Sequence, residues 1–285
     1  MADRPDFLYR LYHTPAGRSV LKILTAPPLS NAAGAFLDTR CSAGLIGPFV
    51  ARTGIDRSDY EQRPFRSFND FFTRRLAPGA RPIDRTPGHL IAPCDGQLSV
   101  YPIRHDLVLP VKGVSYSIAD LLRSRSLARR FDGGVCLVFR LCVDNYHRYA
   151  FFDDGRMCCR YQLRGVLHTV RPVALATRRV FVENSRSVSL MQTRHFGYAA
   201  QIEVGAMLVG RICNRPDVIR FARGDEKGWF EYGGSTVILL LPPDSAVIDS
   251  RFPVGGQETP VRFGEAIGQT KLHFPPEDNH ASQNS

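Results

Sequence analysis

The sequence is poor in lysine. Four of its 37 basic residues are lysines, so arginine carries almost all of the positive charge behind the net charge of +10. Because guanidinium groups bind phosphates and carboxylates through paired hydrogen bonds, this composition suits nucleic acid, an anionic membrane surface or an acidic substrate. A genome rich in arginine codons would produce the same bias, so the charge alone does not choose a partner.

Paired cysteines and long apolar runs are also missing. The seven cysteines are odd in number and contain no C-x-x-C pair, so neither a zinc site nor a secreted disulfide framework is expected. We expect reduced, mostly buried thiols in a cytosolic compartment. Acidic Asp3 and Asp6 interrupt the N-terminus, which argues against a signal peptide. No run reaches the roughly 18 apolar residues that a bilayer-spanning helix needs.

Several common catalytic signatures are absent as well. The G-x-S-x-G elbow of serine hydrolases does not surround Ser235, and neither a P-loop nor a dinucleotide-binding glycine pattern occurs. The scarcity of lysine leaves few candidates for a pyridoxal Schiff base. These absences exclude the most familiar nucleotide-dependent and hydrolytic enzymes, and they leave a hydroxyl-based site open.

The chain divides into three parts that differ in composition and in the spacing of apolar residues. Residues 1–60 carry short apolar patches broken by prolines, with arginines beside aromatic side chains, and are expected to be helical. Such amphipathic helices suit a membrane-docking segment, or else a helical subdomain packed on the body or on a partner. Residues 61–274 form the expected main domain. The polar residues 275–285 are expected to be a disordered tail.

The main domain shows the pattern of short strands separated by glycine and proline. One helix is expected over Ile118–Arg130. The expected strands are Leu98–Ile103, Leu107–Val111, Val135–Val143, Met157–Leu163, Ser187–Met191, Ala199–Val204, Met207–Cys213, Val218–Phe221 and Val237–Leu241. This pattern predicts an α+β fold, with a mainly antiparallel β body and N-terminal amphipathic helices.

A short helix is expected just before this body. Ser67 followed by Asp70 has the spacing of a helix N-cap, and Phe68, Phe71 and Phe72 then fall on one helical face. Taken alone, these residues predict a core helix.

Four stretches of the sequence could carry chemistry. Asp95 lies in a tight turn, His147 follows an apolar strand, His168 precedes Thr169-Val170, and Gly234-Ser235 precedes the strand Val237–Leu241. Each is an ordinary turn or structural residue when read alone. Together, an Asp, a His and a Ser can activate a hydroxyl, because the His takes the Ser proton and the Asp fixes the imidazole tautomer.

Six motifs resemble, in order, those of the phosphatidylserine decarboxylases. They are Phe68-Asn69-Asp70-Phe71-Phe72-Thr73-Arg74 with Arg81-Pro82-Ile83, Pro93-x-Asp95-Gly96, Tyr146-His147-Arg148, Asn184-x-Arg186, Val204-Gly205-Ala206-x-x-Val209-Gly210 and Gly233-Gly234-Ser235-Thr236. The likeness covers about residues 60–270, and the N-terminal helices suit the bacterial-type enzymes. Each motif alone is weak evidence for the family, whereas all six in the same order are specific to it.

The resemblance implies a proenzyme that cuts itself between Gly234 and Ser235. It implies that Ser235 becomes a covalent pyruvoyl cofactor, that Asp95 and a His activate the hydroxyl, and that no metal is used. The ketone would react with the amine of phosphatidylserine and act as the electron sink for loss of CO2, giving phosphatidylethanolamine. The implied partners are the phospholipid, an anionic surface of the cytoplasmic membrane, the two chains of the cut proenzyme and a possible second copy, and not nucleic acid.

The sequence departs from the family pattern at two positions. Relatives often carry a second His three residues after the first, where this chain has Ala150. Either His147 then serves as both base and proton donor, or His168 replaces the missing partner. Arg171 stands where many relatives have Asn. A decarboxylase of free amino acids, and a non-catalytic module that binds membranes or nucleic acid, remain the alternatives.

Overall fold

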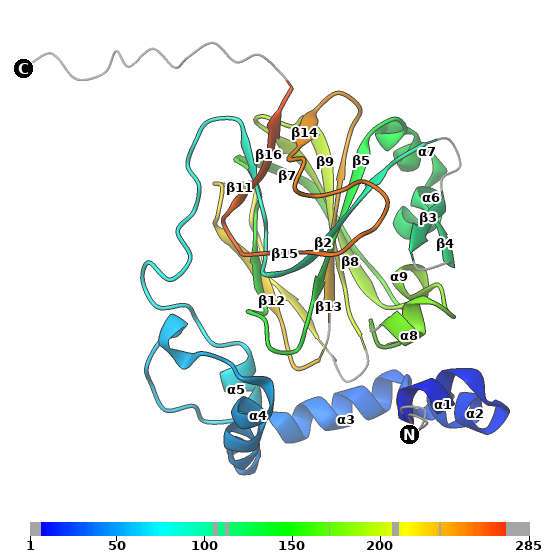
Figure 1. Cartoon of the computed structure of the whole chain (residues 1–285), viewed down its shortest axis with the longest axis vertical. Coiled ribbons are helices and arrows are strands. Elements are labelled where there is room, and N and C mark those ends of the chain that lie inside the picture. Colours follow the sequence, from blue (N-terminus) through cyan, green and yellow to red (C-terminus); the bar gives the residue numbers. More distant parts are fainter. Residues whose placement is uncertain are drawn as a thin grey trace, which may run out of the picture.

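The protein consists of a row of N-terminal helices and a β body above it (Figure 1). The computed structural model describes residues 7–104, 108–111, 114–170, 172–206, 211–233 and 235–271. Within these residues every ladder between named strands is antiparallel. The predicted α+β class, with a mainly antiparallel β body behind N-terminal helices, is therefore confirmed.

We call residues 7–53 the helical arm. Its elements are α1 (Phe7–His13), α2 (Pro15–Leu24), α3 (Pro27–Leu37), the 3-10 helix η1 (Arg40–Leu45) and α4 (Ile46–Thr53). Pro15 and Pro27 stand at the first helical positions, where the missing N–H has no partner to lose. The arm therefore breaks at Pro27 as the sequence predicts, whereas Pro48 lies in the first turn of α4 and does not interrupt that helix. Among the described residues, no helix has the length and apolar content needed to span a bilayer.

Helix α5 (Phe68–Phe72) joins the arm to the body. The Ser67 hydroxyl accepts a hydrogen bond from the Asp70 amide at 3.1 Å, which confirms the predicted N-cap. All three phenylalanines of α5 are buried, in a small cluster with Leu37 of α3 and Phe49 of α4. The prediction of a core helix is confirmed, and the core it enters is shared with the arm.

The main sheet has the strand order β11-β7-β8-β9-β13-β5-β2-β15. Its strands are β2 (Gly96–Pro102), β5 (Val135–Leu141), β7 (Gly155–Leu163), β8 (Arg186–Thr193), β9 (Tyr198–Val204), β11 (Arg220–Phe221), β13 (Ser235–Leu241) and β15 (Thr259–Val261). Every residue of β13 is buried, because this strand lies between β9 and β5 and is covered on both faces. Burial on both faces explains why its sequence is a continuous apolar run.

Smaller sheets and short helices complete the body. One three-stranded sheet contains β10 (Ile212–Asn214), β12 (Glu226–Phe230) and β6 (Arg148–Ala150), and another contains β1 (His89–Ile91), β16 (Ala266–Thr270) and β14 (Ala246–Ile248). Strands β3 (Val108–Val111) and β4 (Val114–Ser117) form a hairpin. The remaining helical turns are η2 (Arg57–Asp59), α6 (Ile118–Leu122), α7 (Arg125–Ala128), η3 (Arg129–Phe131), α8 (Pro172–Leu175) and α9 (Val180–Glu183).

Two local predictions were wrong. The helix expected over Ile118–Arg130 is interrupted, because Arg123 adopts a left-handed conformation (φ 53°) and Ser124 starts a new helix as its N-cap. The cysteines are not mostly buried: Cys94 and Cys136 are, whereas three others are exposed. All seven thiols are free, as expected.

Some predicted boundaries differ from the structure or fall outside the part it describes. The strand expected over Val218–Phe221 is limited to β11. Leu107, Met207–Gly210 and the tail 275–285 lie outside the described residues. Strands of three to five residues, such as β6 and β12, escaped prediction because so few residues show no clear alternation.

A buried ion pair joins the main sheet to the sheet of β12. Lys227 Nζ lies 2.7 Å from Glu203 Oε1, and both side chains are almost completely buried. Asn214 bonds to both of them, and it also accepts from the Tyr149 hydroxyl. Burial lowers the pKa of Lys227, while Glu203 opposes this shift. The pair is tolerated in the interior because nearly every polar atom in the network has a partner.

Replacing one member of this pair alone should destabilise the fold. We expect Lys227→Met to lower the free energy of unfolding by about 3–5 kcal/mol, because Glu203 is left as a buried charge without its cation. The double variant Lys227→Met/Glu203→Leu should recover most of that loss. Urea unfolding of the two variants and the wild type measures this, and equal losses in both variants would contradict it.

Candidate active site

The chemistry-bearing residues gather at one end of the main sheet. Ser235 opens β13 and pairs with Leu141 at the end of β5. On the other side of β5, the backbone of Leu141 lies beside Gly96 at the start of β2. Across β13, Thr236 pairs with Val204 at the end of β9. The end of β9 and the start of β13 are therefore neighbours, about 5 Å apart, whereas the turn of Asp95 lies two strand spacings from β13, beyond the end of β5.

Ser235 is held rigidly although its side chain is unpartnered. Its side chain is completely buried, and its Oγ forms no hydrogen bond within the described part of the chain. Gly233, two residues earlier, has φ 129°, a conformation that favours glycine. The sequence therefore bends sharply at Gly233 and enters the sheet at Ser235. Gly234 itself lies outside the described residues.

His147 presents a free ring nitrogen at this end of the sheet. Its Nδ1 donates to the Asn145 carbonyl at 2.9 Å, so the proton sits on Nδ1 and the lone pair on Nε2. Nε2 is buried and forms no hydrogen bond of normal geometry among the described residues, although the Gly233 backbone lies close enough to raise the pKa of the ring. The ring packs against Phe72 with a centroid distance of 4.0 Å, and the backbone of Gly233 lies beside it. His147 thus offers an unused base next to the bend that precedes Ser235.

Burial keeps His147 neutral. Desolvation, the largest cause, and the positive charge of Arg74 together lower the pKa of His147 from 6.5 to about 3, although the Asn145 and Gly233 backbones act in the opposite direction. Arg74 is itself buried, and it donates to the carbonyls of Asp144 and Asn145 at 3.1 and 3.3 Å. The last residue of the Phe68–Arg74 motif therefore shapes the turn that carries His147 and also sets its charge.

Asp95 is bonded to an arginine rather than to His147. Both of its carboxylate oxygens accept from Arg81, at 3.1 and 3.3 Å, and one also accepts from the Phe263 amide at 2.8 Å. Arg81 bridges on to Asp59 at 2.7 Å. Asp95 thus lies at the same end of the sheet as Ser235, while the Asn145 carbonyl orients the His147 ring.

His168 reaches this region from the opposite side. Its Nε2 lies 3.4 Å from a Glu183 carboxylate oxygen, and its Nδ1 lies 3.3 Å from the Tyr12 hydroxyl of α1. The Asn184 side chain bonds to both backbone groups of His168 and to the Gly205 carbonyl. This amide therefore fixes the His168 loop against the end of β9, next to the start of β13.

Two hollows of opposite charge flank this end of the sheet. One of about 290 Å³ has more acidic than basic residues, since Asp56, Asp59, Asp95 and Asp144 line it together with Arg81 and Arg262. The other, of about 310 Å³, lies beside Gly205 and is basic. Its arginines are Arg164, Arg186 and Arg211. Only the basic hollow has the charge to attract an anionic headgroup.

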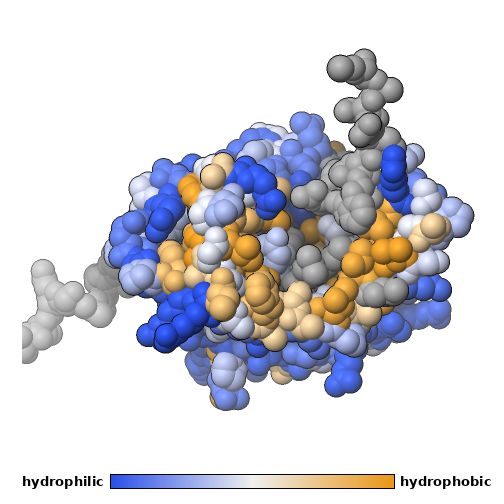
Figure 2. Space-filling model, turned by 90° about the horizontal axis from the view of Figure 1, so that it is seen from below, coloured by the Kyte–Doolittle hydropathy of each residue, from blue (hydrophilic) through white to orange (hydrophobic). Residues whose placement is uncertain are grey.

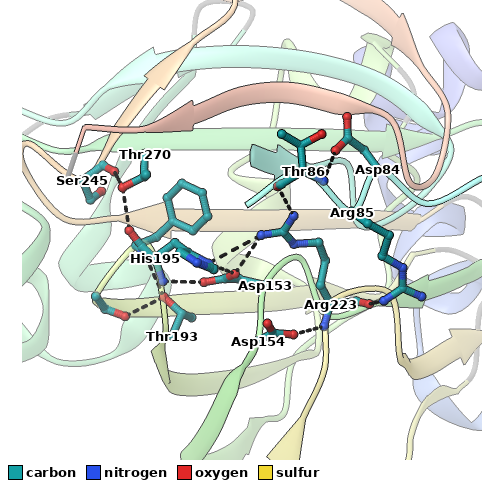
Figure 3. Close-up of polar contacts among 12 residues, drawn as sticks. Asp84, Arg85, Thr86, Asp153, Asp154, Thr193, His195, Arg223, Ser245 and Thr270 are labelled. Atoms are coloured by element: carbon teal, nitrogen blue, oxygen red, sulfur yellow. Dashed lines mark hydrogen bonds and ion pairs between the residues drawn. The ribbon is translucent and has the colours of Figure 1, made fainter. Parts of the chain in front are cut away.

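A second buried Asp–His pair lies at the far end of the sheet and is not part of this site. His195 Nδ1 lies 2.7 Å from Asp153, and Arg223 contacts the same carboxylate at 3.4 Å (Figure 3). His195 stands in the turn between β8 and β9, seven residues of β9 away from the Ser235 end. The Thr270 hydroxyl donates to the His195 carbonyl, so this cluster ties β16 to the sheet.

Sequence reasoning assigned no role to four residues that shape the site. Asn69 and Arg81 lie within the recognised motifs, but the sequence does not predict that Arg81 forms an ion pair with Asp95. Tyr12 carries no sequence signal, because its contact with His168 joins positions 156 residues apart in the chain. Glu183 directly precedes the Asn184-x-Arg186 motif, but no pattern in the sequence indicates its contact with His168. Only the fold brings them together.

The low pKa of His147 makes stability depend on pH. The unfolded chain takes up a proton near pH 6.5, whereas the folded chain resists it until about pH 3, so stability is complete above pH 6.5 and falls as the pH drops. We compare Ser235→Ala with Ser235→Ala/His147→Gln. Between pH 7 and 4.5, the free energy of unfolding should fall by about 2–3 kcal/mol less in the double variant, which lacks the imidazole. Urea unfolding at both pH values measures this, and parallel losses would contradict it.

Comparison with known proteins agrees with this geometry. The family model described as phosphatidylserine decarboxylase matches residues 68–269. The chain is 42% identical to phosphatidylserine decarboxylase proenzyme 2 of Clostridium acetobutylicum over 91% of this chain and 90% of that protein. It is 38% identical to the phosphatidylserine decarboxylase proenzyme of Clostridium botulinum, over 93% of each. The chain therefore belongs to the phosphatidylserine decarboxylase family.

Proposed function

We propose that this chain is a proenzyme that cuts itself between Gly234 and Ser235 and then decarboxylates phosphatidylserine to phosphatidylethanolamine. One observation carries the proposal. The Ser235 hydroxyl and His147 Nε2 are both buried, lack hydrogen-bond partners in the described part of the chain, and flank the bend at Gly233. Buried polar atoms without partners are few in native proteins, because leaving them unpartnered is destabilising, and two of them on either side of one glycine bend call for a chemical explanation.

The self-cleavage follows from these groups. A neutral His147 takes the Ser235 hydroxyl proton while Oγ attacks the Gly234 carbonyl. His147 then passes this proton to the Ser235 nitrogen as the peptide C–N bond breaks, which leaves an ester C–O bond and a free amine. Loss of the Ser235 Cα proton then expels the ester oxygen as the new Gly234 carboxylate. The dehydroalanine left at position 235 takes up water and releases ammonia, which leaves a pyruvoyl group. Asp95 and His168, at the same end of the sheet, stay in the proposed site, with His168 as the second proton carrier.

The surroundings of Ser235 fit such a group. A pyruvoyl group at this position supplies the electron sink that decarboxylation needs. The α chain would then begin with β13, which is paired on both sides with β5 and β9 and buried along its length. These ladders should hold the two chains together after the cut. His147, with its lone pair on Nε2, is placed to hold or return a proton at this strand end.

The arm supports a membrane as the place of action. Five of its large apolar side chains are exposed, namely Tyr9, Val20, Leu29, Phe36 and Leu45. Figure 2 views the molecule from the side of the arm and shows hydrophobic residues gathered over the middle of the face, with hydrophilic residues around them. Exposed basic residues such as Arg18 and Lys22 lie on the same arm. This combination suits peripheral docking on an anionic cytoplasmic membrane surface.

The first test is whether the chain cuts itself and releases CO2. Wild-type protein should separate on a denaturing gel into fragments of 234 and 51 residues, and Ser235→Ala should stay intact because the nucleophile is missing. Wild-type protein should release CO2 from phosphatidylserine in vesicles. Uncut wild-type protein would refute the self-cleavage, and release of CO2 from free amino acids alone would refute the lipid substrate.

The second test concerns the arm. Val20→Glu combined with Phe36→Glu should weaken binding to vesicles that contain phosphatidylserine by at least about tenfold, because two apolar side chains can no longer enter the interface. Sedimentation with vesicles measures the bound fraction. Ile219→Glu is the matched control, since Ile219 is an exposed apolar residue of the β body. An equal loss in the control would show that charge, and not the arm, decides binding.

A further inference from the structure

One amide side chain, that of Asn69, connects the segment that would be cut to the helical arm through hydrogen bonds in both directions. The Asn69 Oδ1 of α5 accepts a hydrogen bond from the Tyr232 amide at 3.3 Å. Its Nδ2 donates in the other direction, to Asp38 at 2.8 Å and to the Gly34 carbonyl at 3.4 Å. Asn69 therefore uses both ends of its amide to connect the C-terminus of α3 with the residue before Gly233.

Ring contacts secure the same segment. The Tyr232 ring packs edge-on against Phe49, Phe68 and Phe72, with centroid distances of 6.4, 5.0 and 5.2 Å. Phe72 also contacts His147 at 4.0 Å. One short helix, α5, thus sets the position of the segment to be cut and of the base beside it.

Ion pairs extend the connection to the far side of the segment. Asp38, which caps α3, also accepts from Arg211, and Arg211 Nε lies 2.7 Å from a Glu231 carboxylate oxygen. Glu231 directly precedes Tyr232. Asp38 is therefore tied to this segment twice, through Asn69 to Tyr232 and through Arg211 to Glu231.

We propose that Asn69 is a positioning residue for self-cleavage, and that Asp38–Asn69–Tyr232 forms a relay by which the arm holds the Gly233-Gly234-Ser235 segment in the geometry of attack. The inference rests on the proposed self-cleavage and adds the group that orients it. The reason is geometric. A glycine restricts its own backbone less than any other residue, and β13 fixes the chain only from Ser235 onward. An anchor before the glycines is needed to define the path between them.

The test follows the appearance of the 51-residue fragment from chain made by cell-free translation. Asn69→Ala should slow cleavage about 10–100-fold, because small displacements of reacting groups reduce rates by that order. Hydroxylamine, which cleaves esters, should not speed release of the fragment from this variant, since the acyl shift itself is slowed. Release that hydroxylamine restores to the wild-type rate would show that the ester forms normally, and would overturn the proposal.

An exchange of the two relay residues tests the bond without removing it. Asn69→Asp alone places two carboxylates against each other and should slow cleavage as Asn69→Ala does. Adding Asp38→Asn restores the hydrogen bond in the opposite direction, because the amide at position 38 then donates to the carboxylate at position 69. The cleavage rate should return to within about threefold of wild type. A double variant that folds and yet stays as slow as Asn69→Asp would overturn the relay, and this comparison holds even if Asn69→Ala does not fold.

Two controls separate positioning from stability. Asn214→Ala removes an amide of similar bonding, to Lys227, Glu203 and Ser187, that does not contact Tyr232. It should lower the melting temperature and leave the cleavage rate within about twofold of wild type. If Asn214→Ala slows cleavage as much as Asn69→Ala does, the effect of Asn69→Ala comes from lost stability. Wild-type chain that fails to cut would refute the proposed function itself, whereas wild-type cutting with an equally fast Asn69→Ala would refute only the role of Asn69.

Discussion

The candidate site depends on the pairing of β13 with β5 and β9. These two ladders fix the backbone from Ser235 onward and bury the whole strand. The same pairing places Ser235 beside Leu141 and Thr236 beside Val204, at the end of the sheet where the turn of Asp95 and the loop of His168 also lie. A hydroxyl at the first residue of a central strand cannot move away from its neighbours. Gly233, two residues before Ser235, has φ 129°, a backbone conformation that favours glycine.

The environment of His147 shows how burial and charge prepare a base. The imidazole lies in an apolar pocket formed by Phe72 and faces the positive charge of Arg74, and both effects favour its neutral form. The Asn145 carbonyl holds the proton on Nδ1, which leaves the lone pair on Nε2. This turn supplies the orientation that a carboxylate gives in a Ser–His–Asp triad. Asp95 instead forms an ion pair with Arg81.

The helical arm contacts the site from several directions. Tyr12 of α1 bonds with His168, the Thr25 carbonyl accepts from the Leu167 amide, and α3 reaches Tyr232 through Asn69. An arm whose outer surface carries exposed apolar residues therefore has an inner surface bonded to the residues around Ser235. The arm proposed to touch the membrane is therefore bonded directly to the loops around the bond proposed to be cut.

Local sequence determined much of this protein. The apolar run after Ser235 predicted a buried strand, the Ser67 spacing predicted an N-cap, and the prolines predicted a broken helical arm, because each depends on neighbouring residues alone. Six ordered motifs identified the family. Tertiary structure alone decided that Arg81 pairs with Asp95, that Asn69 reaches Tyr232, and that Tyr12 and Glu183 flank His168. These contacts join segments far apart in the chain, and the order of strands in the sheet, which no local pattern encodes, brings them together.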